Sequence, residues 1–274
     1  MHNPIIERNN VKILGSGEQT LLFAHGFGCD QNMWRYIIPS FAGKYRIVLF
    51  DYVGCGKSDV SAYNIEKYAS LDGYAQDIID VCHSLDLENV IYVGHSVSSM
   101  IGVLASVRYP ELFSSMVLIG PSPCYVNDAG YAGGFDKKDL IDLLNVMESN
   151  YIGWASFLAP VVMKNEEKPE LSQELEQSFC STDPFITKRF AEATFFSDNR
   201  RDLPKIDVPV LVLQCSDDAI APDYVGEYTA GSIAGSEYVK MQATGHCPHL
   251  SHPEETIDLI TNFLQKTYST VQST

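Results

Sequence analysis

The sequence predicts an α/β protein whose mostly parallel, doubly wound sheet carries a helical insertion. Continuous apolar runs, typical of strands buried on both faces, alternate with amphipathic helical patterns along most of the chain. This alternation stops between about residues 123 and 201, where only helical patterns occur. We therefore expect a core formed by residues 1–122 and 202–274, with a helical insertion at residues 123–201.

The composition of the 274 residues excludes several classes of function. Hydrophobic residues make up 45% of the chain, enough for a full core, and no apolar run is long enough to cross a membrane. A net charge of -16 argues against binding to nucleic acid or to an anionic membrane surface. The first ten residues lack the apolar segment of a signal peptide, so we expect a cytoplasmic protein.

The first half of the chain alternates strands with helices. The buried apolar runs that predict strands are Thr20–Ala24, Arg46–Phe50, Val90–Val93 and Met116–Ile119. Helical periodicity is found in Leu71–Leu85 and Val97–Arg108, each with its apolar residues on one stripe. Because consecutive parallel strands need a crossover, these helices are expected to cover the faces of the sheet.

The insertion contains four predicted helical segments: Asp136–Asn150, Trp154–Met163, Pro169–Cys180 and Pro184–Phe196. They are rich in aromatic residues, which predicts an apolar pocket beneath them. We expect the insertion to have its own core and few ties to the sheet. The alternating pattern then resumes with strands at Val208–Gln214 and Tyr238–Met241 and a closing helix from Pro253 to about Lys266.

A candidate nucleophile, Ser96, lies where the third of these strands meets a helix. The run from Gly94 to Ser98 has the pattern Gly-x-Ser-x-small between strand and helix, which is typical of the nucleophile elbow of an α/β-hydrolase. In such an elbow the N–H of Val97 points at an oxyanion formed on an attacked carbonyl. The N–H of Phe27, in the glycine-containing loop after the first strand, would be the second donor. The alternative is a buried serine at the end of a strand.

A serine nucleophile needs a histidine base and an orienting carboxylate, which follow it along the chain in this fold. Asp217 and Asp218 both follow one predicted strand, and we favour Asp218 because Pro222 comes four residues later. His246 follows Gly245 after the last strand. The sequence therefore predicts a triad of Ser96, Asp218 and His246.

Two competing motifs are weaker. Gly56-Lys57-Ser58 imitates the end of a phosphate-binding loop, but Asp51 stands where that loop needs a glycine. His246, His249 and His252 have a metal-like spacing, but two prolines in this segment disfavour a helix that would align the rings. We expect no metal and no cofactor, and a structural or exposed place for His249 and His252.

The chain resembles the RsbQ-type α/β-hydrolases of bacterial sigma-B stress regulation, which are related to the plant karrikin and strigolactone receptor hydrolases. The motifs that carry the resemblance span nearly the whole chain: His25–Gly28, Phe50–Asp59, Leu71–Ala75, Val93–Val97, Gly120–Tyr125, Asn150–Ala155, Phe196–Asp198 and Gly245–Pro253. The resemblance implies an α/β-hydrolase fold with a four-helix lid and the same triad. It also implies a small hydrophobic pocket formed by Phe27, Phe135, Trp154, Leu158, Phe179 and Phe195. Ser98 is a departure, because the family elbow usually has glycine there.

Two functions from different classes follow. The first is a serine hydrolase that acts on a small hydrophobic ester or lactone. The second is a ligand-sensing signalling protein with slow or incidental hydrolysis, which the resemblance connects to a PAS-domain serine phosphatase as partner. A cofactor-free haloperoxidase or a C–C bond hydrolase shares the triad but fits the lid motifs less well. Enzymes with an aspartate nucleophile are excluded because position 96 is serine.

Overall fold

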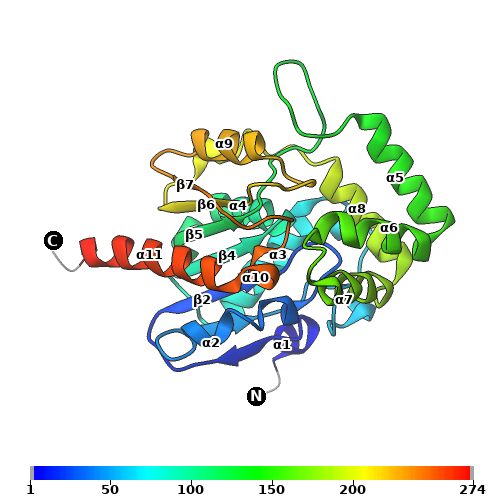
Figure 1. Cartoon of the computed structure of the whole chain (residues 1–274). Coiled ribbons are helices and arrows are strands. Elements are labelled where there is room, and N and C mark those ends of the chain that lie inside the picture. The colour runs from blue at the N-terminus through cyan, green and yellow to red at the C-terminus, as the bar shows by residue number, and fades with distance from the viewer. Residues whose placement is uncertain (1–2, 272–274) are drawn as a thin grey trace.

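A seven-stranded sheet lies between helices on both faces in the computed structural model, which describes residues 3–271 (Figure 1). The strand order is β1-β3-β2-β4-β5-β6-β7, and only β1 is antiparallel to its neighbour. The strands are β1 (Lys12–Leu14), β2 (Thr20–Ala24), β3 (Arg46–Leu49), β4 (Val90–His95), β5 (Phe113–Ile119), β6 (Val210–Gln214) and β7 (Glu237–Lys240). This confirms the predicted mostly parallel, doubly wound sheet. The outermost residues of the two predicted core segments, 1–2 and 272–274, lie outside the described residues.

Alternate residues of the buried strands point to opposite faces of the sheet, and each face has its own helices. Leu22 and Tyr92 face α3 (Leu71–Ser84), α4 (Val97–Arg108) and α9 (Asp223–Gly231). Phe23 and Val93 face α2 (Ile38–Phe41) and α11 (Pro253–Val271). Two further short helices lie outside the insertion, α1 (Pro4–Arg8) and α10 (Pro248–Ser251).

The insertion between β5 and β6 contains α5 (Lys137–Ser149), α6 (Tyr151–Met163), α7 (Pro169–Cys180) and α8 (Pro184–Phe195). These four helices gather on one side of the molecule, away from the C-terminal end of α11 (Figure 1). The expectation of a separate core is wrong, because Leu140, Trp154 and Phe179 belong to the same apolar cluster as Val93 and Leu213 of the sheet. Their apolar faces continue the sheet's own core because they cover the carboxyl ends of its strands.

The sequence prediction missed some short elements and placed the end of the last helix too early. Strand β1 is three residues long and all three are exposed, so it shows no buried apolar run. Helix α9 has nine residues with a glycine in its middle, which weakens its helical pattern. Helix α11 continues to Val271, beyond the expected end near Lys266. Within residues 3–271 no helix is both long and apolar enough to cross a membrane.

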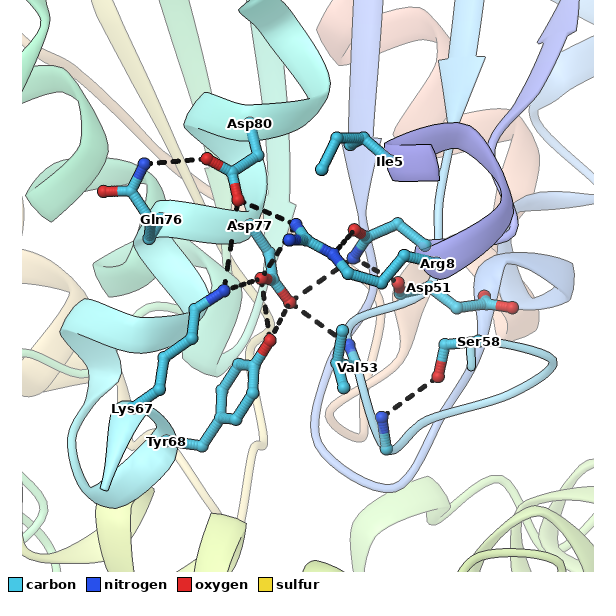
Figure 2. A network of polar contacts seen from close by, with 12 residues as sticks. Ile5, Arg8, Asp51, Val53, Ser58, Lys67, Tyr68, Gln76, Asp77 and Asp80 are labelled. Carbon is cyan, nitrogen blue, oxygen red and sulfur yellow. Dashed lines mark hydrogen bonds and ion pairs between the residues drawn. The ribbon is translucent and has the colours of Figure 1, made fainter. Parts of the chain in front are cut away.

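A fully buried carboxylate, Asp77 of α3, joins three segments beside the sheet (Figure 2). It accepts hydrogen bonds from the hydroxyl of Tyr68 at 2.9 Å and from the N–H of Val53 at 3.2 Å. The Arg8 guanidinium and the Lys67 ammonium lie 3.3 Å and 2.8 Å from the same carboxylate. Asp77 therefore fixes the N-terminal segment and the loop after β3 against α3.

Candidate active site

Ser96 sits at the sharp turn between β4 and α4. Its φ of 55° and ψ of -124° are strained for a residue with a side chain. The turn leaves no room at Gly94, where a Cβ atom would come within 2.6 Å of the Tyr92 ring. The Ser96 N–H donates to the carbonyl of Ile119 at 2.8 Å, which ties the turn to β5. The hydroxyl is thus held above the carboxyl edge of the sheet.

Ser96, His246 and Asp218 form a continuous series of contacts. The Ser96 hydroxyl lies 2.7 Å from His246 Nε2, and His246 Nδ1 lies 2.6 Å from an Asp218 carboxylate oxygen. Because a carboxylate only accepts, Nδ1 donates to Asp218 and Nε2 of a neutral ring is left to accept from Ser96. The other Asp218 oxygen accepts from the N–H groups of Ile220 and Ala221 at 2.8 Å and 3.0 Å.

The remaining candidate acid and histidines lie elsewhere. Asp217 is exposed and pairs with Lys164 at 2.5 Å instead of approaching His246. His249 is fully buried, with its ring centroid 4.6 Å from that of Trp34, and His252 Nδ1 lies 2.9 Å from the Ser251 hydroxyl. Across residues 3–271 no cluster of three or more His, Cys, Asp or Glu side chains could hold a metal ion.

Two backbone N–H groups are available near Ser96. Val97 is the first residue of α4, so its N–H has no acceptor within the helix. Phe27 follows β2, and within residues 3–271 no backbone carbonyl accepts from its N–H. The preceding Gly26 lies against His95, where a Cβ atom would come within 2.5 Å of Nδ1. This close approach brings the loop of Phe27 to the Ser96 turn.

A cavity of about 40 Å³ lies over Ser96 and His246. This volume holds only a few water-sized molecules. Its walls are almost entirely apolar, and they come from both the core and the insertion: Phe27, Tyr125 and Ile220, together with Leu158, Val162, Leu175, Phe179 and Phe195. Of the six expected pocket residues, the structure therefore places Phe27, Leu158, Phe179 and Phe195 on the wall.

The expectation is corrected for the other two pocket residues, Phe135 and Trp154, because neither lines this cavity. Trp154 lies one helical turn before Leu158 on α6, and its ring packs behind the wall, 5.1 Å from that of Phe179. Phe135 precedes α5, where its backbone pairs with Tyr125 and with Asn127, and its partly buried side chain packs against the apolar cluster.

Tyr125 and two cysteines line the cavity but were not among the predicted site residues. Burial raises the pKa of the Tyr125 hydroxyl, and hydrogen bonding to the Ser96 side chain opposes this rise. Burial raises the pKa of Cys29 to about 12 and that of Cys247 well above its usual value, so both remain thiols at neutral pH. Their positions in the sequence could have indicated these residues, because Tyr125 follows β5 and Cys247 directly follows His246 along the chain.

Ser98 connects the two backbone donors. Its hydroxyl donates a hydrogen bond to the carbonyl of His25, two residues before Phe27, and lies 2.9 Å from the buried Tyr52 hydroxyl. A glycine at this position, as in the resembled family, has no side chain to make these contacts. Ser98, in place of that glycine, thus ties α4 to the loop after β2.

The chain is similar to known proteins over nearly its whole length. The chain matches the alpha/beta hydrolase family over residues 21–259. It is 40% identical over 255 residues to Karrikin insensitive 2 receptor CA of Petunia hybrida, covering 93% of this chain and 94% of the receptor. It is 38% identical over 255 residues to Strigolactone esterase D14 of Arabidopsis thaliana, covering 93% and 95%. A hydrolase from Oleispira antarctica has a solved structure that matches with a TM-score of 0.93 and 46% identity, covering 95% of this chain and 96% of that one. The chain belongs to the alpha/beta hydrolase family.

Proposed function

We propose that the protein is a serine hydrolase that cleaves a small apolar ester or lactone. Ser96 is the nucleophile, His246 the general base, and Asp218 the carboxylate that orients the imidazole. The supporting observation is the continuous series of contacts from Ser96 through His246 to Asp218, at 2.7 Å and 2.6 Å. Esterase names among the relatives, such as Strigolactone esterase D14, agree with this reaction class.

The chemistry proceeds in two halves. Ser96 Oγ bonds to the substrate carbonyl carbon while its proton moves to His246 Nε2, and the N–H groups of Phe27 and Val97 bind the resulting oxyanion. Collapse of this intermediate breaks the bond to the alcohol oxygen, which takes the proton from His246. Water, deprotonated by His246, then attacks the acyl carbon. As the bond from that carbon to Ser96 Oγ breaks, His246 returns the proton to this oxygen, which releases the acid and free Ser96.

The cavity sets the class of substrate. Its wall is apolar and its volume is only about 40 Å³, which favours short, neutral acyl groups. A larger substrate requires Phe27, Phe179 or Phe195 to move. We propose that residues 123–201 form a lid that moves when a larger substrate binds, and that residues 1–122 and 202–274 form the hydrolase core.

Covalent labelling tests the proposed nucleophile. Treatment with a serine-directed sulfonyl fluoride should add one adduct to the intact protein, measured by mass spectrometry, and no adduct to Ser96→Ala. Hydrolysis of a short-chain nitrophenyl ester should be lost in the same variant. Equal labelling and equal turnover in both proteins would overturn the assignment of Ser96.

A signalling role is a second candidate function, in the manner of the resembled RsbQ-type regulators, with a PAS-domain serine phosphatase as partner. The observation in its favour is a set of exposed apolar side chains on the insertion: Ile152 at 68%, Phe157 at 65% and Phe185 at 56% exposure. A cytoplasmic location is part of this proposal, and six buried cysteine thiols suit a reducing compartment.

A pull-down tests this surface. The Phe157→Ser protein should lose binding of the phosphatase and keep esterase activity. Retained binding in both Phe157→Ser and Ile152→Ser would count against this surface.

A further inference from the structure

The backbone of His246 is held from two sides. Its N–H donates to the carbonyl of Val162, in the last turn of α6, at 2.8 Å. Its own carbonyl accepts a hydrogen bond from His95 Nε2, at the elbow, at 2.7 Å. His246 therefore bridges the insertion and the core, and its position depends on where α6 ends.

The last residue of α6 together with the segment that follows it, residues 163–168, is here called the α6–α7 link. It lies directly on residues 241–247, the histidine loop. Asn165 joins the two, because its side-chain amide donates to the carbonyl of Met163 at 2.8 Å and to that of Thr244 at 3.0 Å. Asn165 is only 7% exposed, so these bonds are shielded from water.

The contact between the link and the histidine loop is close. A Cβ atom on Gly245 would come within 2.2 Å of the Met163 carbonyl oxygen, so the loop meets the link through bare backbone. Lys164 and Asn165 have φ angles of 48° and 54°, which reverse the chain at the end of α6. Asparagine tolerates this left-handed conformation better than most residues.

We propose that Asn165 is a positioning residue that fixes His246 for catalysis, an inference that rests on the proposed role of His246 as base. Asn165 does not touch the reacting atoms. It ties Thr244, two residues before His246, to the end of α6, and so keeps the Val162 carbonyl opposite the His246 N–H. Without the amide the histidine loop shifts against Ser96, and a displacement of about 1 Å lowers the rate of a positioned reaction about 100-fold.

The nearby ion pair between Lys164 and Asp217 does not carry this coupling. Both side chains are partly exposed, with the Asp217 carboxylate at 64%, and exposed ion pairs contribute little to stability. The buried amide of Asn165 is the contact that water cannot replace without cost.

Three variants separate the amide from the backbone conformation. Asn165→Gly removes the amide and tolerates the positive φ. Asn165→Asp keeps the shape but has no N–H to donate when ionised. Asn89→Gly is the matched control, because Asn89 has a φ of 53°, is exposed, and lies far along the chain at the start of β4.

Turnover of a short-chain ester and hydrogen exchange of residues 241–247 are the two measurements. Both Asn165 variants should lower kcat by roughly 10- to 100-fold with little change in KM, and should exchange faster in the histidine loop. Asn89→Gly should match the wild-type protein in both. A merely structural role would change thermal stability and leave kcat of the folded protein unchanged.

Wild-type kcat in Asn165→Asp, or unchanged exchange in both Asn165 variants, would overturn the proposal. The Ser96→Ala protein distinguishes this failure from that of the proposed function. If wild-type and Ser96→Ala proteins hydrolyse the ester equally, the serine mechanism fails, whereas the exchange rates still decide whether Asn165 holds the histidine loop.

Discussion

Nε2 of His95 lies 2.7 Å from the backbone carbonyl oxygen of His246 and donates a hydrogen bond to it. Burial holds the pKa of His95 well below its usual value, so this donor is a neutral imidazole. Behind it lies His249, with its ring centroid 4.6 Å from that of His95, and burial lowers the pKa of His249 to about 3. Two uncharged histidines thus support the proposed base from inside the core.

These histidines predict how stability depends on pH. In the unfolded chain His249 binds a proton near pH 6.5, but in the folded protein only near pH 3, so the unfolded state binds more protons between these values. The free energy of unfolding should therefore have its full value above about pH 6.5. It should fall as the pH decreases below this value, by up to about 1.4 kcal/mol per pH unit for each such group. In His249→Phe this decrease should be shallower, as measured by urea denaturation at several pH values.

The control for this experiment is His83→Gln, because His83 is exposed. Its replacement should leave the pH dependence of the unfolding free energy unchanged. An equally steep decrease in His249→Phe and the wild-type protein would show that His249 is not the group responsible.

The Asp77 network predicts a large effect on stability with no direct effect on catalysis. Asp77→Asn removes a fully buried charge that faces Arg8 and Lys67, and leaves those cations less compensated. Loss of one partner from a buried ion pair costs about 3–5 kcal/mol. We expect a decrease of that order in the free energy of unfolding, from chemical denaturation, with unchanged kcat in the folded protein.

Asp80 provides the comparison, since it also pairs with Arg8, at 2.8 Å, but its carboxylate is partly exposed. Asp80→Asn should lower stability by about 1 kcal/mol or less. Equal losses in the two variants would mean that burial of Asp77 does not decide the energy of the network.

Much of the core was predictable because buried parallel strands are apolar throughout. The runs at β2, β4 and β6 identified these strands, and their shared direction brings Ser96 and Asp218 to one edge of the sheet. The choice of Asp218 over Asp217 also needed a sequence pattern, the later proline, because both residues follow the same strand.

Other features depend on contacts between distant residues and have no local signal. The hydrogen bond from His246 to Val162 links residues 84 positions apart. Phe135 and Trp154 had suitable chemistry for the pocket, but neither lines it, because Trp154 packs against Phe179 and Phe135 packs against the apolar cluster. Aromatic content predicts an apolar cavity, but it does not determine which rings reach it.

Ser98 is expected to contribute to both stability and rate. Ser98→Ala removes the donor to the His25 carbonyl and a partner of the buried Tyr52 hydroxyl. Burial raises the pKa of Tyr52, so its hydroxyl stays protonated and needs an acceptor. We expect a loss of about 1–3 kcal/mol in the free energy of unfolding, and a lower kcat because the loop of Phe27 is held less firmly.

Ser106→Ala is the matched variant, because this buried serine of α4 donates only to the carbonyl of Val103 within the helix, at 3.0 Å. It should lose less stability and retain wild-type kcat. If Ser98→Ala and Ser106→Ala had the same kcat, the contact between α4 and the loop after β2 would have no role in the reaction.

The small cavity predicts a strict preference for short acyl groups. Leu158 projects from α6 into the wall, so Leu158→Ala enlarges the space over Ser96. Each methylene that a pocket accepts or rejects changes kcat/KM by roughly tenfold or more. We expect the ratio of kcat/KM for a butyryl ester to that for an acetyl ester to rise roughly tenfold in Leu158→Ala. Phe135→Leu, which alters a residue outside the cavity, should keep the wild-type ratio. A larger change in Phe135→Leu than in Leu158→Ala would mean that substrates bind against a different wall.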